Sequence, residues 1–381
     1  MRVSPALIIS ATAMLITGTA QAQSQTKPAD TWALFHGAPK VKNEHGYWKI
    51  RGRVLWDWAS LKETPNGQAT DSFTDTEFRA ARIGLQGQYD AFKYKAEVDF
   101  GGGKTTAKDV NISWHGPVVL TLGQMVAGGS MEEITSSRHI SFTERAMITD
   151  AIGFDRRIGV KLSKGGHDYS LAAGVYGNSI DGAIDGKSTN TVWAARASYA
   201  PVFVKGKIVH VGAHIRHTKR ERGGPKHSAR WGLHLAREKI RPKVGDNATL
   251  YGVELATVQG PFHAHWEYMK EDGDLGNVKG GFVEAGYFLT GESRKYKGSA
   301  GKFGRTKPSR PLSKGGYGGF ELAARYDTLD ARSASDEQVD SWSVGLNWYP
   351  ESHLRVTLDY TDASADTFKA KGLYTRLQID W

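Results

Sequence analysis

The chain ends on GLYTRLQIDW (residues 372–381), and the side chains of this stretch alternate in character. In an extended strand, successive side chains point to opposite faces, so Leu373, Leu377 and Trp381 share an apolar face, whereas Arg376 and Asp380 share a charged one. The end of a soluble domain usually frays. A strand that keeps its apolar face to the last residue therefore raises the question of what covers that face.

The same alternation recurs along the chain. It is clear in WKIRGRVLWDW (residues 48–58) and in FKYKAEVDF (residues 92–100), and it continues at residues 158–162, 169–175, 209–215, 262–268, 342–348 and 354–360. Breaks rich in Gly, Asp and Asn separate the runs. Period-2 alternation of this length predicts β-strands throughout.

A secreted β-sandwich would also alternate, but three features favour a membrane barrel. The polar faces carry full charges, aromatic residues gather at strand ends, and the runs match the roughly 9–11 residues of a tilted membrane-spanning strand. Strands in globular sheets average about 5–6 residues. Because backbone groups in hydrocarbon must be paired within the protein, such strands must close into a barrel. We therefore expect an all-β transmembrane antiparallel barrel whose last strand pairs with the first.

The N-terminus, MRVSPALIISATAMLITGTAQA, has a basic start at Arg2, an apolar run and an A-x-A end at Ala20 and Ala22. This pattern is typical of a secretory signal peptide over residues 1–22. The apolar run is too short for the about 20 residues of a membrane-anchoring helix. We expect a short periplasmic segment at residues 23–46 and a barrel over residues 47–381.

The composition narrows the possible partners. The formal charge is +10, or +9 without residues 1–22, and there is no Cys. Stability must therefore come from backbone pairing and burial and not from disulfides. A basic exported protein suits anionic lipid or an anionic solute, and export makes nucleic acid an improbable partner.

The strand count supports a closed barrel. Seventeen candidates alternate, whereas single-chain outer-membrane barrels have an even number of strands, with both termini, and the short turns, on the periplasmic side and long loops outside. The weakest candidate is RWGLHLARE (residues 230–238), which stands among charged, Gly-rich segments. Assigning it to one long external loop leaves sixteen strands.

The longest irregular stretch is GQMVAGGSMEEITSSRHISFTERAMITDAIGFDRRIGVKL (residues 123–162), between the fifth and sixth strands. Its G-Q start, E-x-x-T-S-S-R core, F-x-E-R pair and R-R-I-G end resemble the phosphate-selective porin O/P family. Similar pieces follow the family order: EFRAARIGLQG (77–87), FLTGESRKY (288–296), ELAARYDTLD (321–330) and GLNWYPESHLRV (345–356). The resemblance implies a homotrimeric outer-membrane porin of about 16 strands whose third loop folds into the lumen. The terminal aromatic Trp381 looks like the signal that barrel-assembly machinery reads in outer-membrane proteins generally.

Basic residues predict what such a pore would pass. Guanidinium groups in a narrow passage can hold a phosphate-type oxyanion bidentately. In the loop 124–156 and at its exit, the candidates are Arg138, Arg145, Arg156 and Arg157. Arg138 and Arg145 could equally hold the loop to the wall through Glu132, Glu133 or Glu144. Further pore-lining candidates project from strands on the lumen phase: Arg51, Arg53, Lys93, Lys95, Arg196, Arg325 and Arg376. Arg79 and Arg82 differ in phase, so both face the lumen only if their strand contains a bulge, and Lys104 and Lys108 are placed on a loop or rim.

The sequence thus predicts passive diffusion of small anions, phosphate or related oxyanions, with a general anion porin as the alternative. An outer-membrane hydrolase built on a barrel is less favoured, because no G-x-S-x-G elbow and no readable Ser–His–Asp arrangement are present. The pairs His263/His265 and His210/His214 could bind a metal, but no Cys or clustered carboxylate completes a site. We expect no enzyme activity, no cofactor and no metal.

Overall fold

The computed structural model describes residues 39–154, 156–183, 189–222 and 227–381. The expected signal peptide at residues 1–22, and the expected periplasmic segment as far as residue 38, lie outside the described residues. The first described element is the short strand β1 (Lys40–Lys42), which pairs antiparallel with the beginning of β2.

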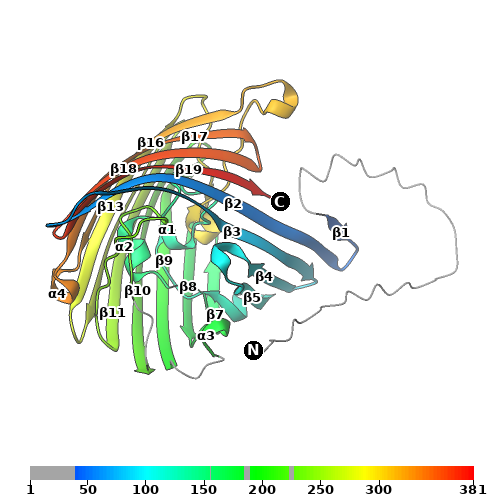
Figure 1. The fold of residues 1–381 in the computed structure, drawn as a ribbon. Helices are drawn as coiled ribbons and strands as arrows, with labels where there is room; N and C mark the ends of the chain where they lie inside the picture. Colours follow the sequence, from blue (N-terminus) through cyan, green and yellow to red (C-terminus); the bar gives the residue numbers. More distant parts are fainter. Residues whose placement is uncertain (1–38, 155, 184–188, 223–226) are drawn as a thin grey trace, which may run out of the picture.

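Sixteen long strands form one closed antiparallel barrel in the described part of the chain (Figure 1). Each strand pairs with the next, and the last strand pairs with β2 from Phe368↔Pro65 to Asp380↔Arg53, which closes the barrel as expected. The strands are β2 (Gly46–Pro65), β3 (Asp71–Tyr89), β4 (Phe92–Asp99), β5 (Thr106–His115), β6 (Val119–Val126), β7 (Arg156–Gly165), β8 (Tyr169–Tyr176), β9 (Thr189–Val204), β10 (Lys207–Arg222), β11 (Asn247–Gln259), β12 (Phe262–Gly273), β13 (Asn277–Phe288), β16 (Gly319–Asp330), β17 (Gln338–Glu351), β18 (Leu354–Ala365) and β19 (Phe368–Asp380).

The excluded seventeenth candidate lies outside these strands. Residues 230–238 belong to the connection between β10 and β11, where only an isolated bridge between Ala229 and Ile240 is formed. Trp231 and Leu233 alternate in this stretch as in a strand, yet both are buried in an apolar cluster that contains loop residues and residues of the barrel wall. The apolar alternation here therefore reflects packing of a loop, and the count of sixteen is confirmed.

Burial separates the two faces of the barrel strands. Large apolar side chains such as Trp56, Leu346 and Trp342 are exposed to the outside, and Trp342 is 65% exposed. The alternate positions carry buried polar groups, among them Asp57 and Arg376. The face on which Leu373 and Leu377 lie is the exposed one, as the C-terminal sequence predicted. An apolar exterior over a polar interior is the arrangement that a lipid surround requires.

The connections carry short elements of their own. These are η2 (Gly101–Gly103), α1 (Met131–Ile134), α2 (Met147–Ile152), α3 (Ile180–Ala183), β14 (Tyr296–Lys297), η3 (Gly298–Ala300), β15 (Lys302–Phe303), η4 (Leu312–Lys314) and α4 (Arg332–Ser335). None of the helices in the described ranges has the length and apolar character that crossing a membrane would require.

One connection corrects the sequence prediction. Residues 289–318 join β13 to β16 at the end of the barrel that holds the short turns and the chain terminus, where we expected only short turns. Arg305 of this segment donates to the carbonyl oxygen of Ser352, in the turn after β17, and pairs with Asp380. A long segment is accommodated at this end because its polar groups bond to the inner wall: Arg196 of β9, for example, donates to the carbonyl oxygen of Gly301 at 2.6 Å.

The β6–β7 loop meets two other connections, each in a separate apolar cluster. Met147 and Ile152 of the β6–β7 loop, residues 127–155, are fully buried in a cluster with Trp231 of the β10–β11 loop. Met131 of the same loop is buried with Tyr296 and Phe303 of segment 289–318. Contacts of α2 with β13 and β16, and of α1 with β15, agree with the position of both helices among the strands in Figure 1.

Candidate pore site

The loop 127–155 is fixed to one arc of the wall by carboxylates on inward-facing strand positions. Each carboxylate accepts a hydrogen bond from a loop backbone amide: Met131 N to Glu254 at 2.6 Å, Glu132 N to Glu267 at 2.7 Å, Thr143 N to Asp359 at 2.7 Å and Met147 N to Asp327 at 2.6 Å. An irregular loop leaves backbone groups unpaired, and burying them without partners would be costly. The wall carboxylates thus supply the partners that secondary structure does not.

Wall arginines complete the attachment from the same arc by donating to loop carbonyl oxygens. The pairs are Arg216 with Ile152 at 2.5 Å, Arg325 with Glu144 at 3.1 Å, Arg355 with Ile140 at 2.6 Å, and Arg376 with Thr143. The carboxylates and arginines stand on β10, β11, β12, β16, β18 and β19. We call this set of contacts the loop latch. It uses acidic and basic wall residues together on one side of the barrel.

Glu144 connects the loop to strands on both sides of the place where β19 pairs with β2 and closes the barrel. Its carboxylate accepts from Arg79 of β3 at 2.9 and 3.0 Å and from Arg376 of β19 at 2.7 Å. Burial alone would raise the pKa of Glu144, but the two guanidinium groups hold it well below its usual range. Glu144 therefore stays ionised over the whole physiological range of pH.

On the other side of the loop lies a cavity of about 530 Å³, which we call the basic cavity. Its lining combines β2–β5, the loop and the tip of segment 289–318, and includes seven arginines and four lysines against four carboxylates. The basic lining residues are Arg51, Arg53, Arg79, Arg82, Lys95, Lys108, Arg138, Arg145, Arg156, Lys297 and Lys302, and the acidic ones are Asp109, Glu133, Glu144 and Asp150.

The acidic groups in this cavity are largely neutralised. Asp109 pairs with Lys95 and, at 2.8 Å, with Arg156, and Glu144 is paired as described above. Burial raises the pKa of Glu133 to about 7, despite the nearby charges of Arg216 and Arg145. The cavity therefore keeps a strong excess of positive charge near neutral pH.

A second cavity of about 590 Å³ adjoins the first along β4–β9. Lys95, Asp109, Ile134 and Lys302 line both, so these residues stand where the two cavities meet. Lys302 Nζ donates to the carbonyl oxygen of Ile134 at 3.0 Å, which joins segment 289–318 to the loop. Burial, followed by the charges of Lys297 and Lys161, lowers the pKa of Lys302 to about 8.

The structure brings six of the basic candidates from the sequence together in the basic cavity: Arg51, Arg53, Lys95, Arg138, Arg145 and Arg156. Arg196 lines the second cavity instead, where it pairs with Glu254 at 2.5 Å. Arg325 belongs to the loop latch, and so does Arg376. Lys93 and Arg157 line neither cavity, and the Arg157 guanidinium lies over the Phe154 ring at 4.8 Å.

Arg145 and Arg138 differ in what they contact. Arg145 donates to the carbonyl oxygens of Glu132 at 3.2 Å, Glu133 at 3.3 Å and Thr135 at 2.8 Å, so it braces the loop internally while facing the cavity. Arg138 pairs with Asp380 at 3.4 Å. Burial, in spite of Asp380, lowers the pKa of Arg138 to about 10, so it remains charged near neutral pH.

The positions of Arg79, Arg82 and Lys108 depend on the register and the bounds of their strands. The register between β2 and β3 shifts between Leu55 and Trp56, and the resulting bulge at Arg79 lets both Arg79 and Arg82 line the cavity. Without this bulge, at most one of the two arginines would face the lumen. Lys108 was placed on a loop or rim, and that placement is wrong: it lies in β5 and lines the basic cavity. Lys104 is exposed just before β5.

Several residues that line the basic cavity were not among the candidates predicted from the sequence. Ser137 Oγ accepts from Arg53 at 3.1 Å, and Ser136 Oγ accepts from Arg138 at 3.2 Å, so the two hydroxyls orient guanidinium groups toward the cavity. The adjacent serines of the T-S-S-R motif were a signal for them. Lys297 and Lys302 carried no such signal, because only short turns were expected at the end of the barrel where their segment lies.

Three of the four histidines considered as metal ligands lie beside carboxylates, and the first of them is His210, 3.3 Å from Glu254. His263 lies 2.8 Å from Glu321, and His265 lies 2.9 Å from Glu267. Within the described residues, no group of three or more His, Cys, Asp or Glu side chains is arranged to hold a metal ion.

A closed antiparallel barrel with an apolar exterior, a polar interior and a charged loop attached to its inner wall is the architecture of an outer-membrane porin. Comparison with known proteins then identifies the family. The model of the phosphate-selective porin O and P family matches residues 48–372, and the chain belongs to this family.

Relatives and structures agree with that assignment. The chain is 31% identical over 363 residues to an uncharacterized protein of Caulobacter vibrioides, covering 88% of this chain and 72% of the relative. It is 25% identical over 441 residues to Porin O of Pseudomonas aeruginosa, covering 99% of this chain and 97% of the relative. The fold is similar to the anion-selective porin from Comamonas acidovorans, with a TM-score of 0.58, 11% identity, and coverage of 88% of this chain and 100% of that one.

Proposed function

We propose that this porin passes small anions by diffusion through the basic cavity, and that phosphate or related oxyanions are its preferred solutes. The observation that carries the proposal is the lining of that cavity, in which eleven basic side chains face four acidic ones. A lumen of one sign raises the local concentration of ions of the opposite sign. The name of the phosphate-selective porin family is consistent with it, and so is the anion selectivity of the Comamonas acidovorans porin.

The loop 127–155 sets the width of the route in this proposal. Because the latch attaches it to the arc of β10–β19, an anion passes between the loop and the arc of β2–β9, through both cavities. Arg51, Arg53 and Arg138 would contact the anion in the first cavity, and Lys95 with Lys302 where the cavities meet. A planar guanidinium binds a tetrahedral oxyanion through two parallel hydrogen bonds, whereas chloride gains less from that geometry.

Throughput requires the site to be weak. An ion that is held tightly blocks the passage, so we expect a dissociation constant in the millimolar range, roughly −4 kcal/mol. The remaining alternative within the same class is a general anion porin that does not distinguish phosphate from chloride.

Two measurements in a planar bilayer test the proposal. The reversal potential under a potassium chloride gradient should have the sign of anion selectivity, and the selectivity should weaken toward 1 M salt, where the Debye length is about 3 Å. Added phosphate should block the chloride current of the wild type. A cation-selective sign would refute the proposal, and a chloride current indifferent to phosphate would leave the general anion porin.

A matched pair of variants locates the site. Arg51→Gln together with Arg138→Gln should weaken the phosphate block, since both residues line the basic cavity. Lys93→Gln removes a positive charge from the same inward phase of β4 but outside both cavities, and it should leave the block unchanged. Arg145 is less suited to this test, because its substitution would also remove the three bonds that brace the loop.

We also propose export by a cleaved signal peptide over residues 1–22, assembly by the barrel-assembly machinery, and a homotrimer in the outer membrane. The apolar outer face described above supports a surround of outer-membrane lipid. Mass measurement of the mature protein would test the cleavage, and crosslinking in membranes would test the trimer.

A further inference from the structure

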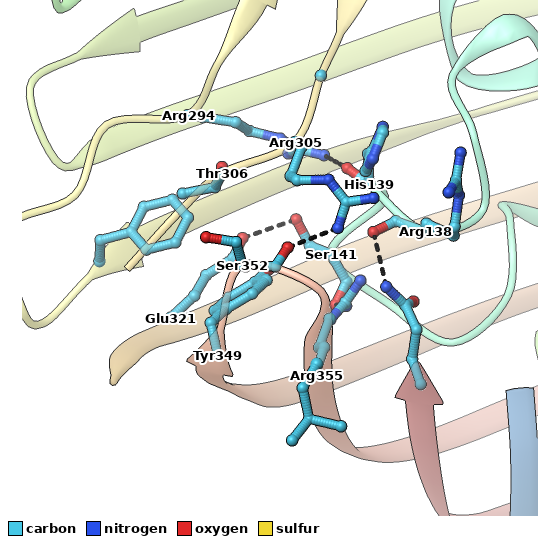
Figure 2. A pocket seen from close by; sticks show the side chains of 14 residues that line it. Arg138, His139, Ser141, Arg294, Arg305, Thr306, Glu321, Tyr349, Ser352 and Arg355 are labelled. Atoms are coloured by element: carbon cyan, nitrogen blue, oxygen red, sulfur yellow. Dashed lines mark hydrogen bonds between the residues drawn. The ribbon is translucent and has the colours of Figure 1, made fainter. Parts of the chain in front are cut away.

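A small enclosed cavity lies at the end of the barrel that holds the chain terminus (Figure 2). Its walls come from the loop 127–155, from segment 289–318, from the turn between β17 and β18, and from β16 and β19. The space inside is about 20 Å³. A cavity needs at least about 10–15 Å³ by this measure to hold one water molecule, so it accommodates a single particle of about that size.

Four arginines line this cavity, each from a different part of the fold: Arg138, Arg294, Arg305 and Arg355. Arg138 belongs to the loop 127–155, Arg294 and Arg305 to segment 289–318, and Arg355 to β18. Among the described lining residues, Glu321 is the single carboxylate. Four like charges around a small enclosed space need compensation, because an unbalanced buried charge is strongly unfavourable.

The nearby carboxylates compensate only part of that charge. Glu321 accepts from Ser141 at 2.8 Å and from Tyr349 at 2.5 Å, and it also contacts His263 at 2.8 Å, so neutral groups occupy much of its capacity. Asp380 is shared between Arg138 and Arg305.

The remaining carboxylate is shared with an arginine outside the cavity. Glu284 lies 3.1 Å from Arg294, but it also lies 2.8 Å from Arg325. Three carboxylates therefore face four arginines, and one of them, Glu284, is divided between Arg294 and Arg325, which also pairs with Glu132 at 3.2 Å. At least one positive charge at the cavity remains unbalanced.

A neutral donor also faces the space. His139 lines the cavity, and its buried Nε2 makes no hydrogen bond within the described residues. Burial, with the charges of Arg138 and Arg305, lowers the pKa of His139 to about 2, so the ring is neutral near pH 7. A neutral imidazole carries one N–H, which can point to an anion.

We propose that this cavity binds a monatomic halide, chloride under ordinary conditions, which joins the loop 127–155 to segment 289–318 and to β18. A single negative charge balances the excess, and the enclosed space excludes a tetrahedral oxyanion with its five heavy atoms. The site is structural and separate from the conduction route, although Arg138 and His139 line both this cavity and the basic cavity. It does not depend on the proposed selectivity of the channel.

Bromide is the probe for this site because its anomalous scattering distinguishes it from water. Crystals of the full-length mature protein soaked in sodium bromide should show an anomalous peak within hydrogen-bonding distance of the guanidinium groups of Arg305 and Arg355. Arg305→Gln should lose the peak. Arg310→Gln changes an arginine of the same segment outside the cavity lining, and it should keep the peak.

A solution measurement tests the structural role. At constant ionic strength, replacing acetate by chloride should raise the unfolding temperature of the wild type by about 2–4 °C, and should not raise that of Arg305→Gln. Water density without an anomalous peak at the cavity would overturn the proposal. So would a peak that persists equally in Arg305→Gln, since it would mark an adventitious ion only. Neither result bears on the reversal potential, so this site and the proposed anion selectivity can fail independently.

Discussion

Replacing Arg325 with methionine tests whether the loop latch holds the pore loop in place. Arg325 donates to Glu132 at 3.2 Å, to Glu284 at 2.8 Å and to the carbonyl oxygen of Glu144 at 3.1 Å. Its guanidinium also lies over the Phe142 ring at 4.4 Å. Methionine keeps much of the volume and the apolar contact but removes every hydrogen bond.

The expected free-energy cost follows from the two buried carboxylates that lose Arg325 as a partner. Glu132 and Glu284 are 2% exposed, so both carboxylates would lose a charged partner without gaining water. Removing one partner of a buried ion pair destabilises the structure by about 3–5 kcal/mol. Because this cost falls on the attachment of the loop and not on the strand pairing, the barrel should persist while the loop opens about 100- to 5000-fold more often.

Hydrogen exchange measures that opening directly. The amides of Thr143 and Met147, which donate to wall carboxylates, should exchange faster by this factor in Arg325→Met, and the phosphate block should weaken because the loop no longer holds its position. Lys93→Met, on the inward phase of β4 and outside the latch, is the matched control and should change neither. Unchanged exchange together with a weaker block would refute the reasoning, because it would make Arg325 an anion ligand and not a latch.

Other predictions follow from single contacts. Anion selectivity should decrease between about pH 7 and 9 as Lys302 loses its proton, since its pKa is about 8, and Lys302→Met should flatten this change in reversal potential. Deleting Trp381 removes its two backbone hydrogen bonds with Gly52, of 3.1 and 3.2 Å, and should lower the yield of heat-modifiable barrel in the outer membrane; a normal yield would contradict this. Trp231→Phe removes the 2.7 Å hydrogen bond to the buried Glu63 and should destabilise the β10–β11 loop by about 1–3 kcal/mol, detected as faster exchange of its amides, while exchange equal to the wild type would contradict the role of this contact.

The strands were predictable because their signal is local. Outward residues such as Trp56 and Leu377 face lipid, and inward residues such as Asp57 and Arg376 do not. The alternation of residue types within each strand therefore shows which of its faces points outward. By the same logic both Arg79 and Arg82 could face the lumen only with a bulge in their strand, and the bulge is present. The count of sixteen also followed, because an all-antiparallel closed barrel needs an even number of strands.

The candidate site was less predictable from the sequence, because an inward-facing basic residue can either line the basic cavity or attach the loop to the wall. Arg51 and Arg53 face the basic cavity, whereas Arg325 and Arg376 have the same phase and charge but attach the loop. The difference lies in which carboxylates the loop brings within reach, and that is a relation between residues more than a hundred positions apart. Lys302 shows the same point, since its segment enters from the end where only short turns were expected.

The sequence by itself determined the class of fold and the basic character of the lumen, since alternation and composition are properties of neighbouring residues and of the whole chain. Only the tertiary structure decided which charges remain available to a solute. A net positive charge remains where basic groups outnumber the carboxylates packed against them, as Arg51, Arg53 and Arg82 outnumber Glu97. Packing in this barrel depends on how the loop 127–155 and segment 289–318 meet the wall. Their contacts, and not the order of residues along any strand, divide the arginines between the latch and the basic cavity.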